Sequence, residues 1–288
     1  MNKDNHYYPY FLAMITVSLW GFMFVAAKES VSNMPPFAIL TVRFFVVAAI
    51  LIPFYRRPPI PLKEVFIISL VFGVGHLGTM FWSLHLGLDS SVGIVVDQIG
   101  IPISLLLAFF AFGEKPRKIA ALGIIFAMIG TFILAGTPNS IGNPIAFYLM
   151  VSTGFFWALY SILLKKYNSP SPLGLIAWIS LLSFPMLGIL SLIFEVNQIS
   201  LINQASSSQI YSLLYTVIFG LIISHSLWGY LMTSYSVNKI VPMILLVPIF
   251  GIFGGAICLH EPISIHMMLG SLMMILGIGI TFIKKNDV

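Results

Sequence analysis

Four ionisable side chains lie deep inside apolar stretches of this 288-residue sequence, and they are the groups that could carry its chemistry. They are Arg43, His76, Asp97 and His225. An ionisable group in a membrane-spanning segment costs roughly 2.5 to 3.5 kcal/mol on insertion scales, so each one present is a candidate functional residue. Asp97 could bind an ammonium group, Arg43 could bind a carboxylate, and each histidine could hydrogen-bond a ligand or carry a proton.

The stretch around Asp97 combines residues that interrupt a helix with residues that bind polar ligands. Asp97 lies seven or eight residues into its apolar segment, which places it about 11 Å deep at 1.5 Å per residue. Residues 97–102 read Asp-Gln-Ile-Gly-Ile-Pro, and the corresponding stretch later in the chain, residues 243–248, also ends in proline. Because backbone groups freed by such interruptions can line a wet cavity, we expect Asp97 and Gln98 to face one. A structural pair for Asp97 is the alternative.

His76 and His225 lie midway along two apolar segments, 149 residues apart. Either could bind a substrate or a proton, whereas a neutral histidine hydrogen-bonded between helices is the structural alternative. Aromatic residues accompany both: Trp82 follows His76 by six residues, and Trp228 follows His225 by three, on the same helical face. We expect these tryptophans, with the hydroxyl of Tyr230, to line the wall of the same cavity.

Arg43 lies about seven residues into its own apolar segment. Its side chain could reach outward to water along its apolar stem, or its guanidinium could bind the carboxylate of a substrate. Lys28 and Glu29, at the end of the preceding segment, could pair with it or gate an exit. The sequence leaves these alternatives open.

The elements that must position these residues are membrane helices. The chain is 59% hydrophobic and 8% charged, whereas an ordinary globular chain carries about 25% charged residues. Spans of about 20 residues with short connections would fill the whole length about ten times, which leaves no room for a soluble catalytic domain. The net charge of +5 is spread over short loops, so we expect no nucleic-acid partner. The single cysteine, Cys258, excludes an intramolecular disulfide, and we expect it in the core.

Ten apolar segments follow one another along the chain. They lie near residues 9–27, 36–55, 64–84, 90–112, 118–136, 144–164, 173–194, 210–232, 238–259 and 265–283. If alternate loops lie on alternate sides, one side holds 12 lysines and arginines and the other holds only Lys28. Because cytoplasmic loops are enriched in these residues, the pattern predicts ten transmembrane helices with both termini cytoplasmic. The longest loop, residues 195–209, would lie outside.

Two halves of the sequence, residues 1–136 and 137–288, repeat the same features. The recurring pairs, 137 to 147 residues apart, are Trp20 with Trp157, Gly73 with Gly220, Pro102 with Pro248, and Glu114 with Glu261. Because five spans is an odd number, the second half would enter the membrane with opposite polarity, as in the inverted repeats of secondary transporters. Chance recurrence in glycine-rich spans is the alternative. Each glutamate precedes a new helix, whose positive N-terminal end we expect it to cap.

The motifs also resemble a known family. The residues that carry the resemblance are Trp20-Gly21, Arg43-Phe44, Phe112-Gly113-Glu114, Leu227-Trp228-Gly229-Tyr230, Pro242 to Pro248 and His260-Glu261-Pro262. In this pattern the chain is similar over nearly its whole length to the EamA branch of the drug/metabolite transporter superfamily, and particularly to bacterial amino-acid metabolite exporters for cysteine and O-acetylserine. The resemblance implies ten spans with both ends inside and a site between spans three, four, eight and nine. Asp97 and His76 depart from it, because glutamines stand there in those exporters.

The expected function is an alternating-access secondary transporter of the bacterial inner membrane, which exports a small amino acid or a related metabolite. Asp97 and Arg43 would engage the charged ends of a zwitterion. Hydrogen bonds would come from His76, Gln98 and His225. The partners would be a small-molecule substrate and the lipid bilayer.

Other functions stay open at this point. The same fold could instead take up or exchange S-adenosylmethionine or another host metabolite, because sequence does not encode direction. A membrane-embedded enzyme would need titratable groups clustered at one membrane face, and a channel would conduct without saturation. The sequence contains no GxxxxGK[ST], HExxH or GxSxG motif, so we expect no cofactor, metal or catalytic residue. Proton coupling through the histidines, and a homodimer packed through Gly251 and Gly255, stay open.

Overall fold

The computed structural model describes residues 7–88, 90–115, 117–135, 143–258 and 265–281. Within these ranges every regular element is a helix. Among the described residues, seven helices are long and apolar enough to cross a membrane, and three shorter apolar helices accompany them. The described part of the chain therefore has the architecture of a multi-pass helical membrane protein.

Each predicted apolar segment is helical over most of its length. The elements are α1 (Tyr8–Ser30), α2 (Pro36–Leu51), α3 (Leu62–Ser69), η1 (Leu70–Gly78), α4 (Thr79–His85), α5 (Ser90–Asp97), α6 (Gly100–Phe112), α7 (Lys118–Ala135), α8 (Pro144–Tyr167), α9 (Pro172–Phe194), α10 (Gln198–Asn203), α11 (Ser207–Val217), η2 (Ile218–Ile223), α12 (Ser224–Ser234), α13 (Val237–Ile240), η3 (Val241–Leu246), α14 (Val247–Cys258) and α15 (Ile265–Thr281). Helices α2, α8 and α9 begin with proline, whose missing N–H would have no helical partner in the first turn. Serine or asparagine side chains cap α8, α9 and α11.

Irregular helical stretches fall at matching places in the two halves of the sequence. The stretches η1 and η2 are π-helical and contain Gly73 and Gly220, which the predicted repeat pairs. The helix formed by α5 and α6 is broken just before Pro102, and the 3₁₀-helical η3 lies just before Pro248. Since proline has no N–H to donate, the backbone before it cannot continue the regular α-helical bonding.

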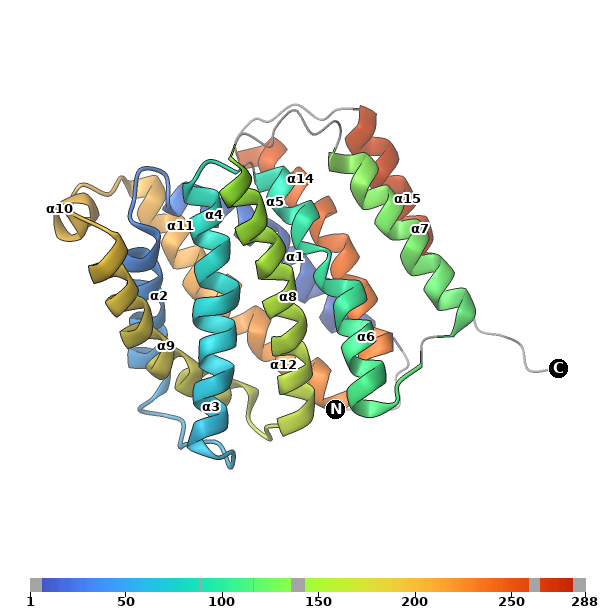
Figure 1. Ribbon diagram of the computed structural model, residues 1–288, viewed down its shortest axis with the longest axis horizontal. Helices are drawn as coiled ribbons and strands as arrows, with labels where there is room; N and C mark the ends of the chain where they lie inside the picture. Colours follow the sequence, from blue (N-terminus) through green and yellow to red (C-terminus); the bar gives the residue numbers. More distant parts are fainter. Residues whose placement is uncertain (1–6, 89, 116, 136–142, 259–264, 282–288) are drawn as a thin grey trace.

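Two helix pairs flank a central group of helices (Figure 1). Helix α7 packs along α15 at one end of the molecule, and α2 packs along α9 toward the other end. Between these pairs, α1 packs against α14, α11 and α12, while α8 packs against α6, η1 and α4. The buried apolar core extends through this central group, where the ionisable residues lie.

The contact between α7 and α15 is close because glycines face each other. Gly123 lies against Gly277 and Gly130 lies against Gly270, as in an antiparallel pair. A Cβ atom added at Gly277 would lie 2.6 Å from the carbonyl oxygen of Gly123, and one added at Gly130 would lie 2.7 Å from that of Gly270. The absence of side chains at these positions therefore sets the spacing of the pair.

The GxxxG glycines of α14 pack inside the bundle. Gly251 and Gly255 are buried, and a Cβ atom added at Gly21 of α1 would lie 2.8 Å from the backbone nitrogen of Gly251. The motif therefore serves a contact within one chain. The prediction that Cys258 is a core residue is wrong: it ends α14 on a turn that faces outward, and both Cys258 and Ile257 are exposed.

Glu114 caps a helix, although not the one that follows it in sequence. Its Oε2 accepts hydrogen bonds from the backbone N–H groups of Val237 at 2.9 Å and Asn238 at 3.4 Å, in the first turn of α13. The reason is Gly113, which ends α6 in the left-handed conformation at φ 68° and turns the chain out of the helix. Glu261 lies outside the described residues.

Replacing Gly277 with alanine is expected to destabilise the protein by about 1 to 3 kcal/mol, because the added methyl group overpacks against the backbone of α7. Gly279 is the matched control on the same helix: no described atom lies within 4 Å of where its Cβ would be, so Gly279→Ala should be neutral or slightly stabilising. Thermal unfolding of the detergent-solubilised protein measures both. Equal effects of the two substitutions would contradict the close packing.

Candidate functional site

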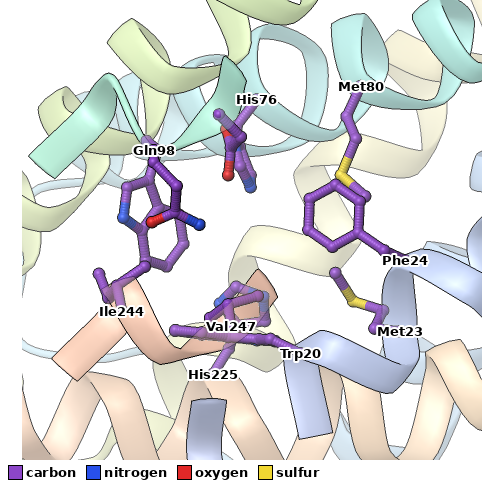
Figure 2. Close-up of a pocket in the computed structure, with 11 residues that line it drawn as sticks. Trp20, Met23, Phe24, His76, Met80, Gln98, His225, Ile244 and Val247 are labelled. Atoms are coloured by element: carbon purple, nitrogen blue, oxygen red, sulfur yellow. The ribbon is translucent and has the colours of Figure 1, made fainter. Parts of the chain in front are cut away.

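A small cavity lies at the centre of the bundle and is lined by residues from both halves of the sequence (Figure 2). The lining residues are Trp20, Met23, Phe24, His76, Met80, Asp97, Gln98, Trp157, His225, Ile244 and Val247. Both η1 and η3 contribute, as does the break between α5 and α6. Its volume of about 20 Å³ suits water rather than an amino acid. Side chains must therefore move before a larger ligand binds.

One side of the cavity presents hydrogen-bond acceptors that lack donors. Asp97 ends α5, and Gln98 follows in the break before α6. Among the described residues, no group donates to the buried Oδ1 of Asp97 or to the Oε1 of Gln98. The amide nitrogen of Gln98 donates to the carbonyl oxygen of Ile94 at 3.2 Å, which leaves the amide oxygen for a ligand. Because buried acceptors without donors cost free energy, this side favours a ligand that carries N–H groups, such as an ammonium.

The two histidines of the cavity differ in their hydrogen bonding. The Nδ1 of His76 lies 3.3 Å from the carbonyl oxygen of Thr153 on α8. Since a carbonyl oxygen only accepts, Nδ1 carries the proton and Nε2 is the acceptor of the neutral ring. His225 is 1% exposed, and both of its ring nitrogens lack a partner in the described part of the chain. His225 is therefore open to a ligand that donates or accepts a hydrogen bond.

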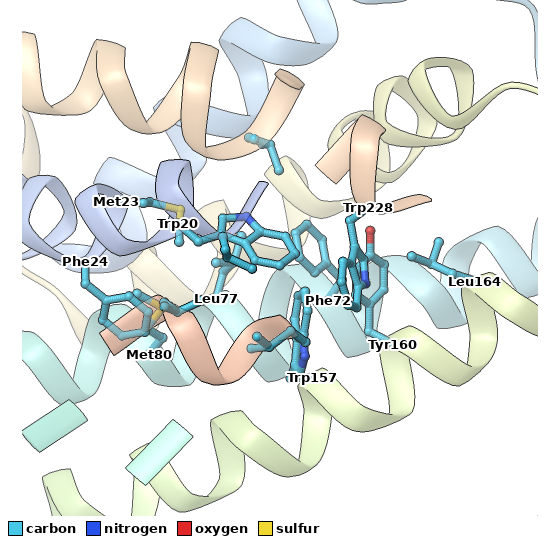
Figure 3. Close-up of a cluster of buried hydrophobic side chains, with 14 of the residues drawn as sticks. Trp20, Met23, Phe24, Phe72, Leu77, Met80, Trp157, Tyr160, Leu164 and Trp228 are labelled. Carbon is cyan, nitrogen blue, oxygen red and sulfur yellow. The ribbon is translucent and has the colours of Figure 1, made fainter. Parts of the chain in front are cut away.

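Tryptophans from the two halves meet beside the cavity (Figure 3). The ring centroids of Trp20 and Trp157, which the repeat pairs, lie 4.9 Å apart with an interplanar angle of 87°. Trp20 lies 5.1 Å from His225, and Trp157 lies 5.0 Å from His76. Because the predicted repeat pairs Trp20 with Trp157 and nearly pairs His76 with His225, these two contacts are counterparts of each other. Trp228 is fully buried and packs against both tryptophans at 5.2 and 5.5 Å, so it supports the wall without lining the cavity.

Arg43 is buried one side chain away from the cavity. None of its surface is exposed, so it does not reach outward to water. Its Nη2 lies 3.7 Å from the sulfur of the cavity-lining Met23, and its guanidinium lies 5.6 Å from the centre of the Phe81 ring. Within the described ranges, its Nε and Nη1 have no hydrogen-bond partner and no carboxylate pairs with it. A buried guanidinium without a counter-charge favours an anionic ligand.

Gly220 makes room for this guanidinium. A Cβ atom added at Gly220 would lie 2.8 Å from the sulfur of Met23 and 3.4 Å from Nη2 of Arg43. Any larger residue in this turn of η2 would displace one of them. The glycine of the π-helical stretch therefore allows a cation from α2 to lie against α1.

Asp97 and Arg43 approach the cavity from different helices, α5 and α2. Figure 2 shows Gln98 on one side of the cavity and Met23 on the other. Asp97 precedes Gln98 and lines the same cavity, and Arg43 lies behind Met23. A ligand with a positive and a negative end could bridge the two sides once Met23 moves.

Trp82 and Tyr230, which were also expected in the wall, do not line this cavity either. Trp82 stacks on Phe37 at 4.7 Å and faces a separate hollow of about 320 Å³ among α2, α4, α8 and α9. Six residues along a helix turn a side chain by about 240°, which directs Trp82 away from the side of His76. Tyr230 lies further along α12, with its ring 6.4 Å from that of Tyr235. Because Tyr230 follows the cavity-lining His225 by five residues on α12, its side chain also points away from the cavity.

Several lining residues are of types that sequence reasoning assigns to packing. Tryptophan and methionine commonly fill cores, so their presence alone does not single out Trp20, Trp157, Met23 or Met80. A signal exists for the tryptophans, because they are the first pair of the repeat. In an inverted repeat such a pair can meet where the two halves face each other.

Polar contacts close the lysine-rich end of the central helices. The Oε1 of Glu114 lies 3.6 Å from Nζ of Lys165, which also donates to the carbonyl oxygen of Tyr235. Nζ of Lys239 lies 5.1 Å from the centre of the Tyr10 ring and 5.2 Å from that of Tyr235. Burial raises the pKa of the Tyr235 hydroxyl. These contacts join elements of both halves at one end.

The model of the EamA-like transporter family matches the chain twice, over residues 8–136 and 144–283. The chain belongs to this family. It is 28% identical to a protein of Escherichia coli (strain K12) named probable amino-acid metabolite efflux pump, over 93% of each chain. It is 30% identical to a protein of the same name from Salmonella typhimurium, over 94% of this chain and 93% of that one. A crystal structure with 16% sequence identity covers 94% of this chain and 95% of its own, with a TM-score of 0.77, and therefore shares the fold.

The predicted resemblance to the EamA branch is confirmed by these matches. This EamA-like protein is a membrane transporter, and residues of both halves of its sequence line the central cavity.

Replacing Arg43 of this EamA-like transporter with methionine is expected to raise its stability by about 2 kcal/mol while abolishing transport, because the change removes an uncompensated buried charge and keeps the apolar stem. Thermal unfolding in detergent and uptake into proteoliposomes measure the two effects. Arg43→Lys keeps the charge and should gain no stability. A loss of stability in Arg43→Met would mean that the guanidinium has a structural partner, against its assignment to a ligand.

Proposed function

We propose that this protein is a secondary transporter of the bacterial inner membrane that exports small amino acids or related metabolites by alternating access. The observation that carries the proposal is the central cavity. Among the described residues, Asp97 presents an acceptor there without a donor, and Arg43, behind Met23, has no carboxylate beside it. A zwitterionic amino acid supplies both missing charges. The names of the relatives from E. coli and Salmonella, probable amino-acid metabolite efflux pumps, support the same substrate class.

Each side chain then has a role in binding. Asp97 binds the ammonium group of the substrate, and Arg43 binds its carboxylate. Met23 must first swing aside, which its flexible thioether side chain allows. His76 and His225 hydrogen-bond the substrate, and their position in the cavity also gives a route for proton coupling.

We further propose ten spans in two inverted five-helix repeats, residues 1–136 and 137–288, with both termini cytoplasmic. The helix contacts support this, because α1 packs against α14 as α8 packs against α6, while α7 pairs with α15 and α2 with α9. The π-helical η1 and η2 agree with it, as do the two separate matches of the family model, one in each half. Such a repeat places the substrate site between the halves, which rock about it.

The topology can be tested with a reporter enzyme that is active only outside the inner membrane. Fused after Ala205, in the short connection between α10 and α11, the reporter should be active. Fused after Arg57, in the loop that carries Arg56 and Arg57, it should be inactive, because basic loops stay in the cytoplasm. The reverse pattern would contradict the proposed orientation.

Alternating access requires the two ends to open in turn. In the proposed topology the contacts of Glu114 with Lys165, and of Lys165 with Tyr235, close the cytoplasmic end. They must break before a substrate can load from the cytoplasm.

Uptake or exchange of S-adenosylmethionine is the second candidate function. The tryptophan rings of Trp20 and Trp157 beside the cavity favour it, because aromatic faces bind sulfonium-type cations and stack on purines. The same molecule carries an amino-acid end that Asp97 and Arg43 could bind. Its size and added positive charge distinguish it from small amino acids in a transport assay.

Asp97→Asn is expected to lower amino-acid transport at least about thirtyfold, with a raised KM, because the amide removes the counter-charge of the substrate ammonium. The measurement is uptake by proteoliposomes of radiolabelled cysteine, O-acetylserine, a panel of neutral amino acids and S-adenosylmethionine, with and without a proton gradient. Gly279→Ala, far from the cavity, is the control and should transport at the wild-type rate.

Transport, affinity and pH dependence that stay unchanged in Asp97→Asn would remove Asp97 from the site. Accumulation of amino acids that depends on the gradient would support proton-coupled export. Movement of S-adenosylmethionine alone, indifferent to the gradient, would overturn the proposed substrate class.

A further inference from the structure

A second hollow, of about 730 Å³, lies on the opposite face of α1 from the central cavity. Four residues of α1 form its floor at the spacing i, i+3, i+4, i+7: Phe22, Val25, Ala26 and Glu29. On the helix these positions point roughly away from Trp20 and Met23, which line the central cavity. The transport mechanism proposed above does not use this groove.

The walls of the groove are α11 and the end of α14. Ser208, Tyr211, Ser212 and Tyr215 of α11 line it at the same helical spacing, and Cys258 ends α14 beside them. Two helices that present matching stripes to one hollow form an elongated slot rather than a round pocket.

Two hydrogen bonds fix the ends of this slot. The hydroxyl of Tyr215 donates to the carbonyl oxygen of Leu19 at 3.2 Å, and the amide of Gln209 donates to that of Ser32 at 2.6 Å. Helices α1 and α11 therefore run antiparallel here. Glu29 consequently lies near the start of α11.

The groove is polar at one end and apolar at the other. Glu29 and Ser208 lie at the polar end, and Phe22 lies at the apolar end. The neighbouring surface of α14 is apolar, since Phe253 is 56% and Ile257 is 55% exposed. Large exposed apolar side chains on a membrane helix face lipid, so the groove opens toward acyl chains.

We propose that this groove binds one phospholipid with an ethanolamine headgroup. The ammonium would lie at Glu29, with which no cation pairs among the described residues. The phosphate would lie at the first turn of α11, where Ser208 offers a hydroxyl and the helix dipole is positive. One acyl chain would follow Phe22 toward the apolar end.

Charge complementarity selects this occupant. The carboxylate of Glu29 attracts an ammonium headgroup, whereas the glycerol headgroup of phosphatidylglycerol offers no cation. A small soluble amine would leave the apolar end of the groove unfilled. In the topology proposed above, Glu29 and the start of α11 lie at the outer side of the membrane, so the lipid would belong to the outer leaflet. This assignment alone depends on that topology.

The native cysteine gives a direct measurement. Cys258 is the only cysteine of the chain, is exposed and lines the groove, so a small thiol-reactive fluorophore can be attached there. The labelled protein is reconstituted into phosphatidylglycerol bilayers, into which phosphatidylethanolamine or phosphatidylglycerol with brominated chains is titrated. Bromine quenches a nearby fluorophore, and we expect half-maximal quenching at about fivefold less brominated phosphatidylethanolamine, the size of a partly exposed ion pair.

Substitutions can test the charge of Glu29 and the space in the groove separately. Glu29→Gln should remove the preference between the two lipids, whereas Glu29→Asp keeps the charge and should retain it. Ser212→Trp fills the groove without changing Glu29 and should abolish the saturable quenching. Native mass spectrometry of the unlabelled protein should find one retained phosphatidylethanolamine, lost in Ser212→Trp.

Equal quenching by the two lipids that Glu29→Gln does not change would mean ordinary annular lipid, and would overturn the proposal. Absence of a retained lipid in the unlabelled protein, together with unsaturable quenching, would overturn it as well. Both measurements are made without substrate. Failure of the transport proposal therefore leaves this one standing, and the reverse also holds.

Discussion

A charge inside a membrane bundle needs a partner of opposite sign, and the centre of this protein holds two charges that lack one in the described structure. Arg43 is fully buried against Met23, and Asp97 presents a buried, unbonded oxygen to the cavity. If these side chains met, their pair would neutralise both charges and leave nothing for a ligand to satisfy. Keeping them apart sacrifices stability and leaves opposite charges available to a substrate.

The irregular helices keep this arrangement in place. A regular α-helix would satisfy its own backbone and present a continuous apolar stripe, whereas the break before Pro102 brings Asp97 and Gln98 to the cavity. On the other side, the π-helical η2 places Gly220 where a guanidinium can lie. The corresponding irregular stretches of the other half, η3 for the break and η1 for η2, also contribute residues to the cavity. The two inverted five-helix repeats proposed above would explain why the breaks converge on one place.

Sequence could predict those features that depend on one segment at a time. The helices follow the apolar segments, and the depth of Asp97 within its segment indicated a cavity, because depth and periodicity are local properties. Contacts between segments are not local. From the sequence, Arg43 could either reach outward to water or bind a substrate. Only the positions of α1 and α4 show that its side chain is enclosed. It also could not tell Trp20 and Trp157 from packing residues, because their role follows from facing each other across the two halves.

Helix α1 is shared by the cavity and the lipid-facing groove. Its Trp20 and Met23 face the cavity, and its Phe22 and Glu29 face the groove. In the proposed mechanism Met23 must move before Arg43 can be reached. If α1 rotates as a rigid helix during this movement, its opposite face moves as well. A ligand shifts such an equilibrium only by its difference in affinity for the two positions of the helix. A lipid that fits the groove in one position of α1 would therefore favour one state of the cavity, and by linkage substrate binding would change the affinity of the groove for lipid by the same factor.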